Sequence, residues 1–236
     1  MPRHGKKYRD AIEKVDPEQT YQLDDAISLL KQISYADFDE SVDAAINLNV
    51  NPRHADQMVR GSLVLPHGRG KETKVLVFAK GEHATKAEEA GADFVGADDL
   101  IERITEEQWT GFDVAVATPD MMGQVGRIGR ILGPRGLMPN PKSGTVTFEI
   151  EKIVDELKAG RVEFRVDKAG IIHISFARRS FPEEHIKENM MEVVETLARL
   201  RPASAPAPYF QKISISTTMS PGIKLDAGFA RELTAA

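Results

Sequence analysis

Apolar and polar residues alternate over several short segments in the first and last thirds of the chain. Between Phe38 and Val50, every second residue from Val42 onward is apolar, and mostly polar residues lie between them. This period of two is typical of a strand with one buried face. The segment Gly61–Leu65 is expected to form its partner strand, because the turn-forming Asn51-Pro52 step lies between the two segments.

The last third of the chain repeats this alternation. Residues 162–166 and 172–176 are apolar at every second position, and the turn-forming sequence Asp167-Lys168-Ala169-Gly170 separates them. This arrangement predicts a hairpin. Residues 211–217 predict a closing strand. Both terminal thirds therefore indicate antiparallel α+β structure.

Three helices are expected beside these strands. A basic arm leads into a short helix through about Val15, and a second helix begins near Asp24, whose side chain can cap it. A long amphipathic helix extends to about Leu200. Ser180 is its candidate cap, and Pro182 lies in its first turn.

The middle third has a different pattern. Residues 74–79 form a nearly continuous apolar run, as expected for a strand that is covered on both faces. Two further strands are expected around residues 94–95 and 114–117, with a helix after the first strand and another over residues 98–107. This β-α-β-α-β order indicates a small parallel, Rossmann-like sheet. A further helix is expected near residues 150–158.

The predicted fold class is therefore a combination of α/β and α+β. Residues 1–67 and 160–236 are expected to form one split α+β base domain from both ends of the chain, with a Rossmann-like α/β domain of residues 68–159 inserted between them. The two joints lie near Pro66–Gly70 and Gly160. Two chain connections would permit a hinge motion between the domains.

The segment after the third parallel strand, Met121–Lys142, is rich in glycine and cations. It contains five glycines and three prolines, and no acid lies between Asp120 and Glu149. Its cations are Arg127, Arg130, Arg135 and Lys142. Bare backbone and guanidinium groups without carboxylates favour the binding of anions. The alternative is a helix whose arginines lie on the solvated side, with a buried stripe of Val125, Ile128, Ile131 and Leu132.

The same segment contains a long ordered set of residues. Thr118-Pro119-Asp120 and Met122 precede an uninterrupted run from Gly129 to Lys142, and Gly144-Thr145-Val146 follows it. This pattern resembles the signature of the family of large-subunit ribosomal protein one, the protein of the lateral stalk of the ribosome, and it is similar to the bacterial type. The resemblance extends over nearly the whole chain and implies the same split base domain with an inserted second domain.

The resemblance continues in three segments of the base domain, at residues 38–42, 164–173 and 217–221. It implies that they border an rRNA-binding face made of Phe38, Glu40, Ser41, Arg165, Lys168, His173, Thr217, Thr218, Met219 and Ser220. A secondary contact with RNA or tRNA is implied for Arg127, Arg130, Arg135 and Lys142. The chemistry is suitable, because hydroxyl groups can pair with ribose 2′-hydroxyls and methionine can lie flat on a ribose or a base.

Some of these residues also have an ordinary structural interpretation. Phe38 could pack into the core, and Thr217 could simply reflect the preference of strands for threonine. The sequence departs from the family pattern, with Asp37 in place of a lysine, Ala177-Arg178 in place of Gly-Lys and Ser220 in place of a glycine. These departures indicate either fewer phosphate contacts or adaptation to a salt-rich interior.

The resemblance implies a structural constituent of the large ribosomal subunit that is not an enzyme. Its partners would be large-subunit rRNA at the mobile stalk, the deacylated tRNA whose release from the exit site it assists, and an operator in its own mRNA, whose translation it would repress. It would need no cofactor and no metal. Outside the ribosome it would be a cytoplasmic monomer.

Composition limits these expectations. The chain has 36 acidic and 31 basic residues and a formal charge of −5, whereas nucleic-acid-binding domains are usually basic. Positive charge is instead local, as in the first nine residues, which contain Arg3, Lys6, Lys7 and Arg9. The chain contains no cysteine, which excludes disulfides and cysteine zinc sites. Because it contains no long apolar run and no leader pattern, we expect a cytoplasmic protein with no membrane partner.

Sequence signals for an enzyme are weak. Gly68–Thr73 resembles a phosphate loop, but Leu65 stands where its first glycine is needed and Glu72 where the metal-binding hydroxyl is needed. The six histidines have no metal-binding spacing, and Lys80-Gly81-Glu82 is not a dinucleotide fingerprint. The competing interpretation is a Rossmann-like enzyme that binds a phosphorylated small molecule at the Arg130–Arg135 loop.

Overall fold

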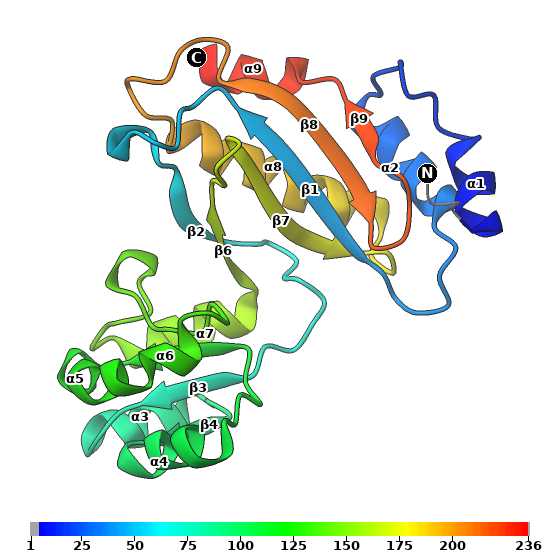
Figure 1. The fold of residues 1–236 in the computed structure, drawn as a ribbon. Coiled ribbons are helices and arrows are strands. Elements are labelled where there is room, and N and C mark those ends of the chain that lie inside the picture. Colours follow the sequence, from blue (N-terminus) through cyan, green and yellow to red (C-terminus); the bar gives the residue numbers. More distant parts are fainter. Residues whose placement is uncertain (1–4, 236) are drawn as a thin grey trace. The chain divides into compact units, whose positions relative to one another are not determined.

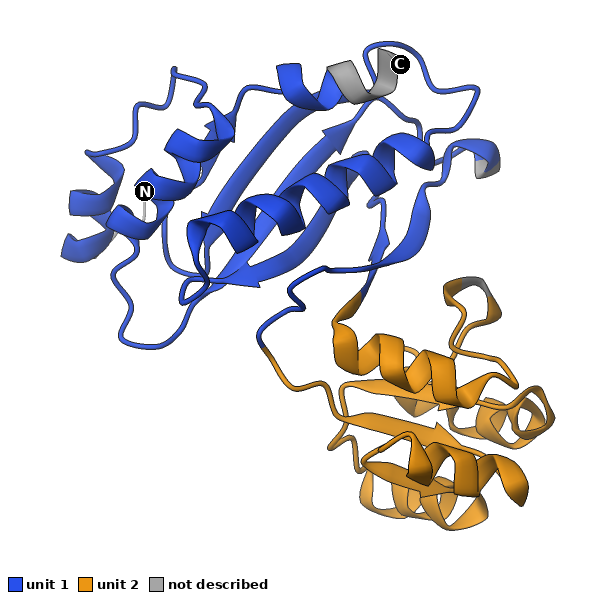
Figure 2. Cartoon of the chain, turned by 180° about the vertical axis from the view of Figure 1, so that it is seen from behind, with its two compact units in different colours: residues 1–70, 162–236 blue, residues 71–161 orange. Residues whose placement is uncertain are grey.

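The computed structural model describes residues 5–235, apart from the side chains of residues 55, 142 and 232–235. The chain forms two compact units (Figure 2): unit 1 comprises residues 1–70 and 162–236, and unit 2 comprises residues 71–161. The chain thus enters unit 2 after Gly70 and leaves it after Arg161. Arg3 of the basic arm lies outside the described residues.

A four-stranded antiparallel sheet forms the centre of unit 1 (Figure 1). Its strands are β1 (Ser41–Leu48), β7 (Ile171–Arg178), β8 (Phe210–Thr217) and β9 (Ile223–Leu225), in the order β7-β1-β8-β9. The alternation in the sequence sets the two faces of the sheet. In β1 the side chains of Val42, Ala44, Ile46 and Leu48 are buried, and the residues between them are only partly covered. This bears out the half-buried strand that the alternation predicts.

Helices cover one face of this sheet. They are α2 (Leu23–Ile33), α8 (Glu183–Arg199) and α9 (Gly228–Ala235). The helix α1 (Lys6–Ile12) lies beside α2, and a short turn of 3-10 helix, η1, spans Ala55–Gln57. Figure 1 shows the strands in front of α8, and Figure 2, from behind, shows α8 in front of the strands. Apolar residues of α2 and α8 pack with the buried face of the sheet in one core. No helix among the described residues covers the other face of the sheet.

Two predicted strand pairings are wrong. The strand β2 (Arg60–Val64) pairs with β6 (Arg161–Arg165) in a separate two-stranded sheet and not with β1, because β7 and β8 occupy both edges of β1. Likewise β6 and β7 are not a hairpin, because β6 pairs with β2 and β7 pairs with β1, although the turn between them is formed. The amide of Asp167 donates to the carbonyl of Ile171 (2.8 Å), and Gly170 has a φ of +82°, but the two strands then enter different sheets.

The predicted helix caps are also wrong. The N-cap of α2 is Gln22, and the carboxylate of Asp24 forms an ion pair with Lys187 (2.7 Å). The N-cap of α8 is Pro182, because Ser180 donates its hydroxyl to Asp39 (2.9 Å). The first helix, α1, ends at Ile12, before the position that the sequence predicted. Short polar side chains can bond to several neighbours, so a cap pattern alone does not choose among them.

Unit 2 contains a three-stranded parallel sheet in the order β4-β3-β5. Its strands are β3 (Val75–Phe78), β4 (Phe94–Gly96) and β5 (Val114–Ala117), and its main helices are α3 (Glu82–Glu89), α4 (Asp98–Glu107) and α7 (Ile150–Ala159). All four residues of β3 are buried, because one core lies on each face of this strand. Burial on both faces explains the continuous apolar run in the sequence.

The glycine- and cation-rich segment forms an interrupted helix. It consists of η2 (Pro119–Met121), α5 (Met122–Val125), η3 (Gly126–Ile128) and α6 (Gly129–Leu132), and η4 (Pro141–Ser143) follows after a loop. Of the stripe that the helical alternative predicted, Val125, Ile128 and Leu132 are buried and Ile131 is only partly buried. Arg127 and Arg130 lie exposed. Gly136 has a φ of +72°, which only glycine adopts freely in the loop after α6.

Candidate nucleic-acid interface

Two segments of unit 1 meet at one edge of the four-stranded sheet, the edge where β1 begins and β8 ends. The register pairs Val42 of β1 with Thr217 of β8, which brings residues 34–41 beside the turn at 217–221. The amide of Ser41 donates to the Thr218 hydroxyl (3.2 Å), and the hydroxyl of Tyr35 donates to the carbonyl of Met219 (2.9 Å). These bonds hold the two segments together as one surface.

Two large apolar side chains project from this surface. Phe38 is 54% exposed and Met219 is 46% exposed. The alternative of a core position for Phe38 is therefore wrong. Exposing such groups on a loop held by hydrogen bonds has no benefit for folding, and it is typical of a contact surface.

Glu40 and Thr217 lie beneath this surface and not on it. Their exposed fractions are 0% and 2%. The hydroxyl of Ser34 donates to the Glu40 carboxylate and lies 3.4 Å from the Thr217 hydroxyl oxygen. The second carboxylate oxygen of Glu40, Oε1, is buried without a hydrogen-bond partner. In this structure the two side chains lie beneath the surface and support it, and their part in RNA binding stays a prediction.

Residues 178–180 fix the loop that carries Phe38. The guanidinium of Arg178 donates to the carbonyl of Asp39, and that of Arg179 donates to the carbonyl of Ala36, each at 2.9 Å. The amide and hydroxyl of Ser180 donate to the Asp39 carboxylate at 3.0 and 2.9 Å. The loop is therefore ordered before any ligand binds.

Arg178 and Arg179 also bring positive charge to this edge. Neither guanidinium forms an ion pair with an acid among the described residues. Each keeps donors for an anionic ligand, because each makes only one hydrogen bond to a carbonyl. Sequence reasoning did not assign these arginines to the site. The signal was present, since Arg178 takes the position of a lysine in the family pattern.

Arg165, Lys168 and His173 lie away from this edge. The amide of Leu48 donates to the carbonyl of Gly170 (2.9 Å), so the turn with Lys168 lies at the far end of β1, roughly 20 Å from Ser41 at the usual rise of a strand. Lys168 and Arg165 are both exposed. One ligand can meet both groups only if it is as long as the sheet.

His173 lies between these two ends, opposite Ala45. Its imidazole is 3.7 Å from the Asp167 carboxylate. The amide of Ile171, which donates to that carboxylate, lowers the pKa of Asp167 below its usual range, and the neighbouring His173 has a smaller effect in the same direction.

Small polar residues line the uncovered face of the sheet between the two ends. The register places Ser175 and Ser216 on either side of Asp43, and Lys212 beside Asn47. Ser214 pairs with Ala45 in the row between them. Sequence reasoning treated these positions only as the polar half of an alternating pattern.

The expected secondary contacts lie in unit 2. Arg127 and Arg130 are exposed and have no ion pair among the described residues. Arg135 donates to the hydroxyl of Thr110. The side chain of Lys142 lies outside the described part of the structure.

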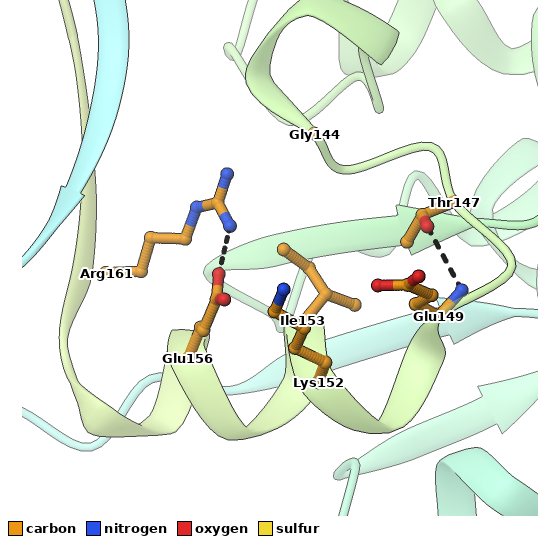
Figure 3. Close-up of a pocket in the computed structure, with 7 residues that line it drawn as sticks. All are labelled: Gly144, Thr147, Glu149, Lys152, Ile153, Glu156 and Arg161. Atoms are coloured by element: carbon orange, nitrogen blue, oxygen red, sulfur yellow. Dashed lines mark hydrogen bonds and ion pairs between the residues drawn. The ribbon is translucent and has the colours of Figure 1, made fainter.

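A small pocket beside α7 does not suit a ligand. Its volume is about 130 Å³, below the range of roughly 300 to 1,000 Å³ for small-molecule sites. Figure 3 shows that Arg161 points at Glu156, with which it forms an ion pair, and that the amide of Glu149 donates to the Thr147 hydroxyl (3.0 Å). Arg161 also donates to the carbonyl of Ser143 (2.8 Å), so this side chain connects the end of η4 to α7.

Two classes of site are missing from the described residues. No group of three or more histidine, aspartate or glutamate side chains within residues 5–235 could hold a metal ion. In that part of the chain, no helix has both the length and the apolar composition needed to cross a membrane.

The sequence was also compared with models of known protein families. Residues 30–221 match the model of the ribosomal protein L1p/L10e family. The match covers most of the chain, includes all of unit 2, and extends over both segments that form the surface around Phe38 and Met219.

Proposed function

The chain belongs to the ribosomal protein L1p/L10e family and is a structural, rRNA-binding protein of the large ribosomal subunit, and we propose that the surface around Phe38 and Met219 makes its main rRNA contact. The observation that carries this proposal is the pair of exposed apolar side chains on two hydrogen-bonded segments, beside two arginines that have no acidic partner within the described part of the chain. Such a surface favours a folded RNA, because apolar groups pack on riboses and bases while guanidiniums meet phosphates.

The uncovered sheet face extends this surface. Its serine hydroxyls suit ribose 2′-hydroxyls, which distinguish RNA from DNA. Lys168 and Arg165 at the far end would then meet phosphates of the same RNA. The support for this part is the position of Ser175 and Ser216 on either side of Asp43, with Ser214 in the next row of the same face.

Two further activities belong to the proposal. Unit 2 would contact the deacylated tRNA at the exit site through Arg127 and Arg130, and so assist its release during movement of the stalk. The exposed position of both guanidiniums supports this contact. The protein would also repress translation of its own mRNA, because an mRNA fold that imitates the rRNA site would bind the same surface of unit 1.

The test is the substitution Met219→Glu in the full-length protein. The expected result is binding to the stalk rRNA at least about 30-fold weaker, because a carboxylate about 8 Å from a phosphate costs about 2 kcal/mol at the effective dielectric of a protein surface. The measurement is filter binding at two salt concentrations. The matched control is Leu200→Glu, since Leu200 is also exposed (41%) but lies at the end of α8 near Gly61. Equal affinities of both variants would remove Met219 from the interface.

A further inference from the structure

A crevice opens in unit 2 where the strand order reverses. The chain goes from β3 to β4 on one side and then crosses to β5 on the other side, so the carboxyl ends of β3 and β5 border a switch point. In open parallel sheets, ligands bind at this place. A cavity of about 490 Å³ lies here, within the usual size range of small-molecule sites. Lys80 and His83 line it after β3, and residues from Thr118 to Arg127 line it after β5.

The lining combines cations with a carboxylate. Arg127 is exposed and forms no ion pair among the described residues. Lys80 donates to Asp98 (2.9 Å) and Gln124 (3.2 Å), and because the Lys80–Asp98 pair is half exposed it can be exchanged for another anion at little cost. Asp120 adds an acceptor for hydroxyl groups. This set suits a ligand with both an anionic group and hydroxyls.

Aromatic groups lie beside the crevice. Val146 forms a parallel bridge with Ala117, which places Phe148 just beyond the carboxyl end of β5. The Phe148 ring is 51% exposed, and its centre lies 5.6 Å from that of the His83 imidazole. Nδ1 of His83 is buried without a hydrogen-bond partner. An exposed ring next to phosphate-binding cations is typical of proteins that bind unstacked bases.

The backbone leaves room for a ligand to approach. Gly123 lines the crevice, and no atom lies within 4 Å of the Cβ position at Gly123 or at Gly81. Gly81 precedes α3 with a φ of +60° and provides no side-chain cap, and the amide of Ala84 donates to its carbonyl (3.0 Å). The first two amides of α3, those of Glu82 and His83, therefore stay available to an anion.

We propose that this crevice binds one nucleotide unit, either a free nucleoside 5′-phosphate or an unpaired nucleotide of an RNA strand. Arg127 and Lys80 would hold the phosphate, Asp120 would accept bonds from the ribose hydroxyls, and Phe148 would stack on the base. The crevice takes a single nucleotide and not a dinucleotide, because the turn after β3 contains only Gly81 and no glycine fingerprint. This inference concerns unit 2 and does not depend on the rRNA surface of unit 1.

The experiment follows backbone amide signals of the full-length protein by NMR. The probes are adenosine 5′-monophosphate, adenosine, inorganic phosphate and a single-stranded adenylate trinucleotide. The monophosphate should shift the amides of Gly81, His83, Gly123 and Arg127, whereas adenosine or phosphate alone should bind more weakly. The trinucleotide separates the two sources: shifts of the same amides by both probes identify RNA as a ligand, and shifts by the monophosphate alone identify a free nucleotide.

Three variants test the assigned roles. Arg127→Gln should weaken binding of the monophosphate at least about tenfold, because it removes a charge-assisted bond to phosphate. Phe148→Ser should weaken the binding of monophosphate and adenosine alike. Gly123→Val should block the crevice without disturbing the fold, since its Cβ would meet no atom. The matched control is Lys86→Gln on an exposed residue at the other end of α3, which should change nothing.

The proposal is overturned if no probe shifts the crevice amides, if the shifts lie in unit 1, or if Lys86→Gln and Arg127→Gln have equal effects. The rRNA affinity of each variant is measured in parallel. An intact rRNA affinity with lost nucleotide binding supports the crevice. If the Met219→Glu variant loses rRNA binding and still binds the nucleotide, the two sites are independent of each other.

Discussion

Replacing Asp39 with alanine is expected to weaken rRNA binding, whereas replacing the neighbouring Asp37 is expected to strengthen it slightly. The two substitutions remove the same charge from the same exposed loop. They differ because Asp39 accepts two hydrogen bonds from Ser180, and the structure gives none to Asp37. The pair therefore separates the order of the loop from its charge.

The magnitudes follow from the geometry. Each of the two bonds to Asp39 contributes about 1 kcal/mol at an exposed site. Their loss therefore destabilises the ordered conformation of the loop by about 2 kcal/mol. This limits the loss of affinity to about 30-fold, because binding then requires the loop to be ordered first. Removing a carboxylate near phosphates gains about 0.5 kcal/mol in a solvated setting, or about twofold. The net expectation is roughly 3- to 15-fold weaker binding for Asp39→Ala and about twofold tighter binding for Asp37→Ala.

The assay is filter binding of stalk rRNA, together with hydrogen exchange of the Ser180 amide. This amide should exchange faster in Asp39→Ala, and its exchange rate should be unchanged in Asp37→Ala. If Asp39→Ala speeds this exchange but raises the affinity as much as Asp37→Ala does, the order of the loop has no part in binding. The reasoning would then be refuted, and charge alone would govern this edge of the sheet.

Three further outcomes are expected. Arg178→Gln should reduce the slope of log affinity against log salt by about 0.7 to 0.9, as for one lost phosphate contact, and an unchanged slope places this arginine off the RNA. Burial raises the pKa of Tyr209 to about 12, so the neutral phenol is favoured in the fold and stability falls as pH rises above the usual value of about 10. Tyr209→Phe should remove this dependence with no loss of stability in urea unfolding, since the hydroxyl is buried without a partner. A hydrogen bond with His67 lowers the pKa of Glu188 below its usual 4.5. The pair therefore stabilises the fold above about pH 4.5, and this stabilisation is lost as pH falls through the lowered pKa. A carbon NMR titration should find a higher pKa for Glu188 in His67→Ala, because the largest cause of the lowering is removed.

Hydrophobic period predicted the elements better than it predicted their partners. The bounds of α4 and β5 are those expected from the sequence, and the alternation over residues 41–48 gives the buried face of β1. The pairing of β2 with β6 was not predictable, because period 2 states which face is buried and not which strand lies alongside. The sequence predicted that β2 pairs with β1, the strand that precedes it in the chain. In the structure two strands that are distant in the sequence, β7 and β8, pair with β1 instead.

Family resemblance proposed where the candidate site lies, but it did not predict which of its side chains are exposed. Family resemblance selected Phe38 and Glu40 alike, but one side chain is exposed and the other has no exposed surface. Glu40 is buried beside Ser34, the C-cap of α2, and the alternation of apolar and polar residues does not record this side-chain bond although the two residues are only six positions apart. The bonds from Ser180 to Asp39 were missed for a different reason, since they join residues 141 positions apart in the sequence.

The acidic surplus of the chain is compatible with RNA binding at unit 1, because unit 1 contains 20 acids and 19 bases, whereas unit 2 contains 16 acids and 12 bases. The acids of unit 1 also lie mostly away from the proposed RNA surface. The long helix α8 exposes Glu184, Glu188 and Glu195, and it covers the face of the sheet opposite to the row of serines. Charges on that side are separated from the other face by α8, the apolar core and the sheet, a distance well beyond the Debye length of about 8 Å at physiological salt. Net charge therefore affects the long-range approach of RNA to this protein, whereas binding at contact depends on the charges on one face of the sheet. On that face, Asp43 lies among the serines and Lys212. Replacing Asp43 with serine should then strengthen rRNA binding more than replacing Glu195 with serine, although both change the net charge equally. Filter binding at low and physiological salt compares the two variants, and equal gains at physiological salt would mean that total charge, and not its placement, sets the affinity.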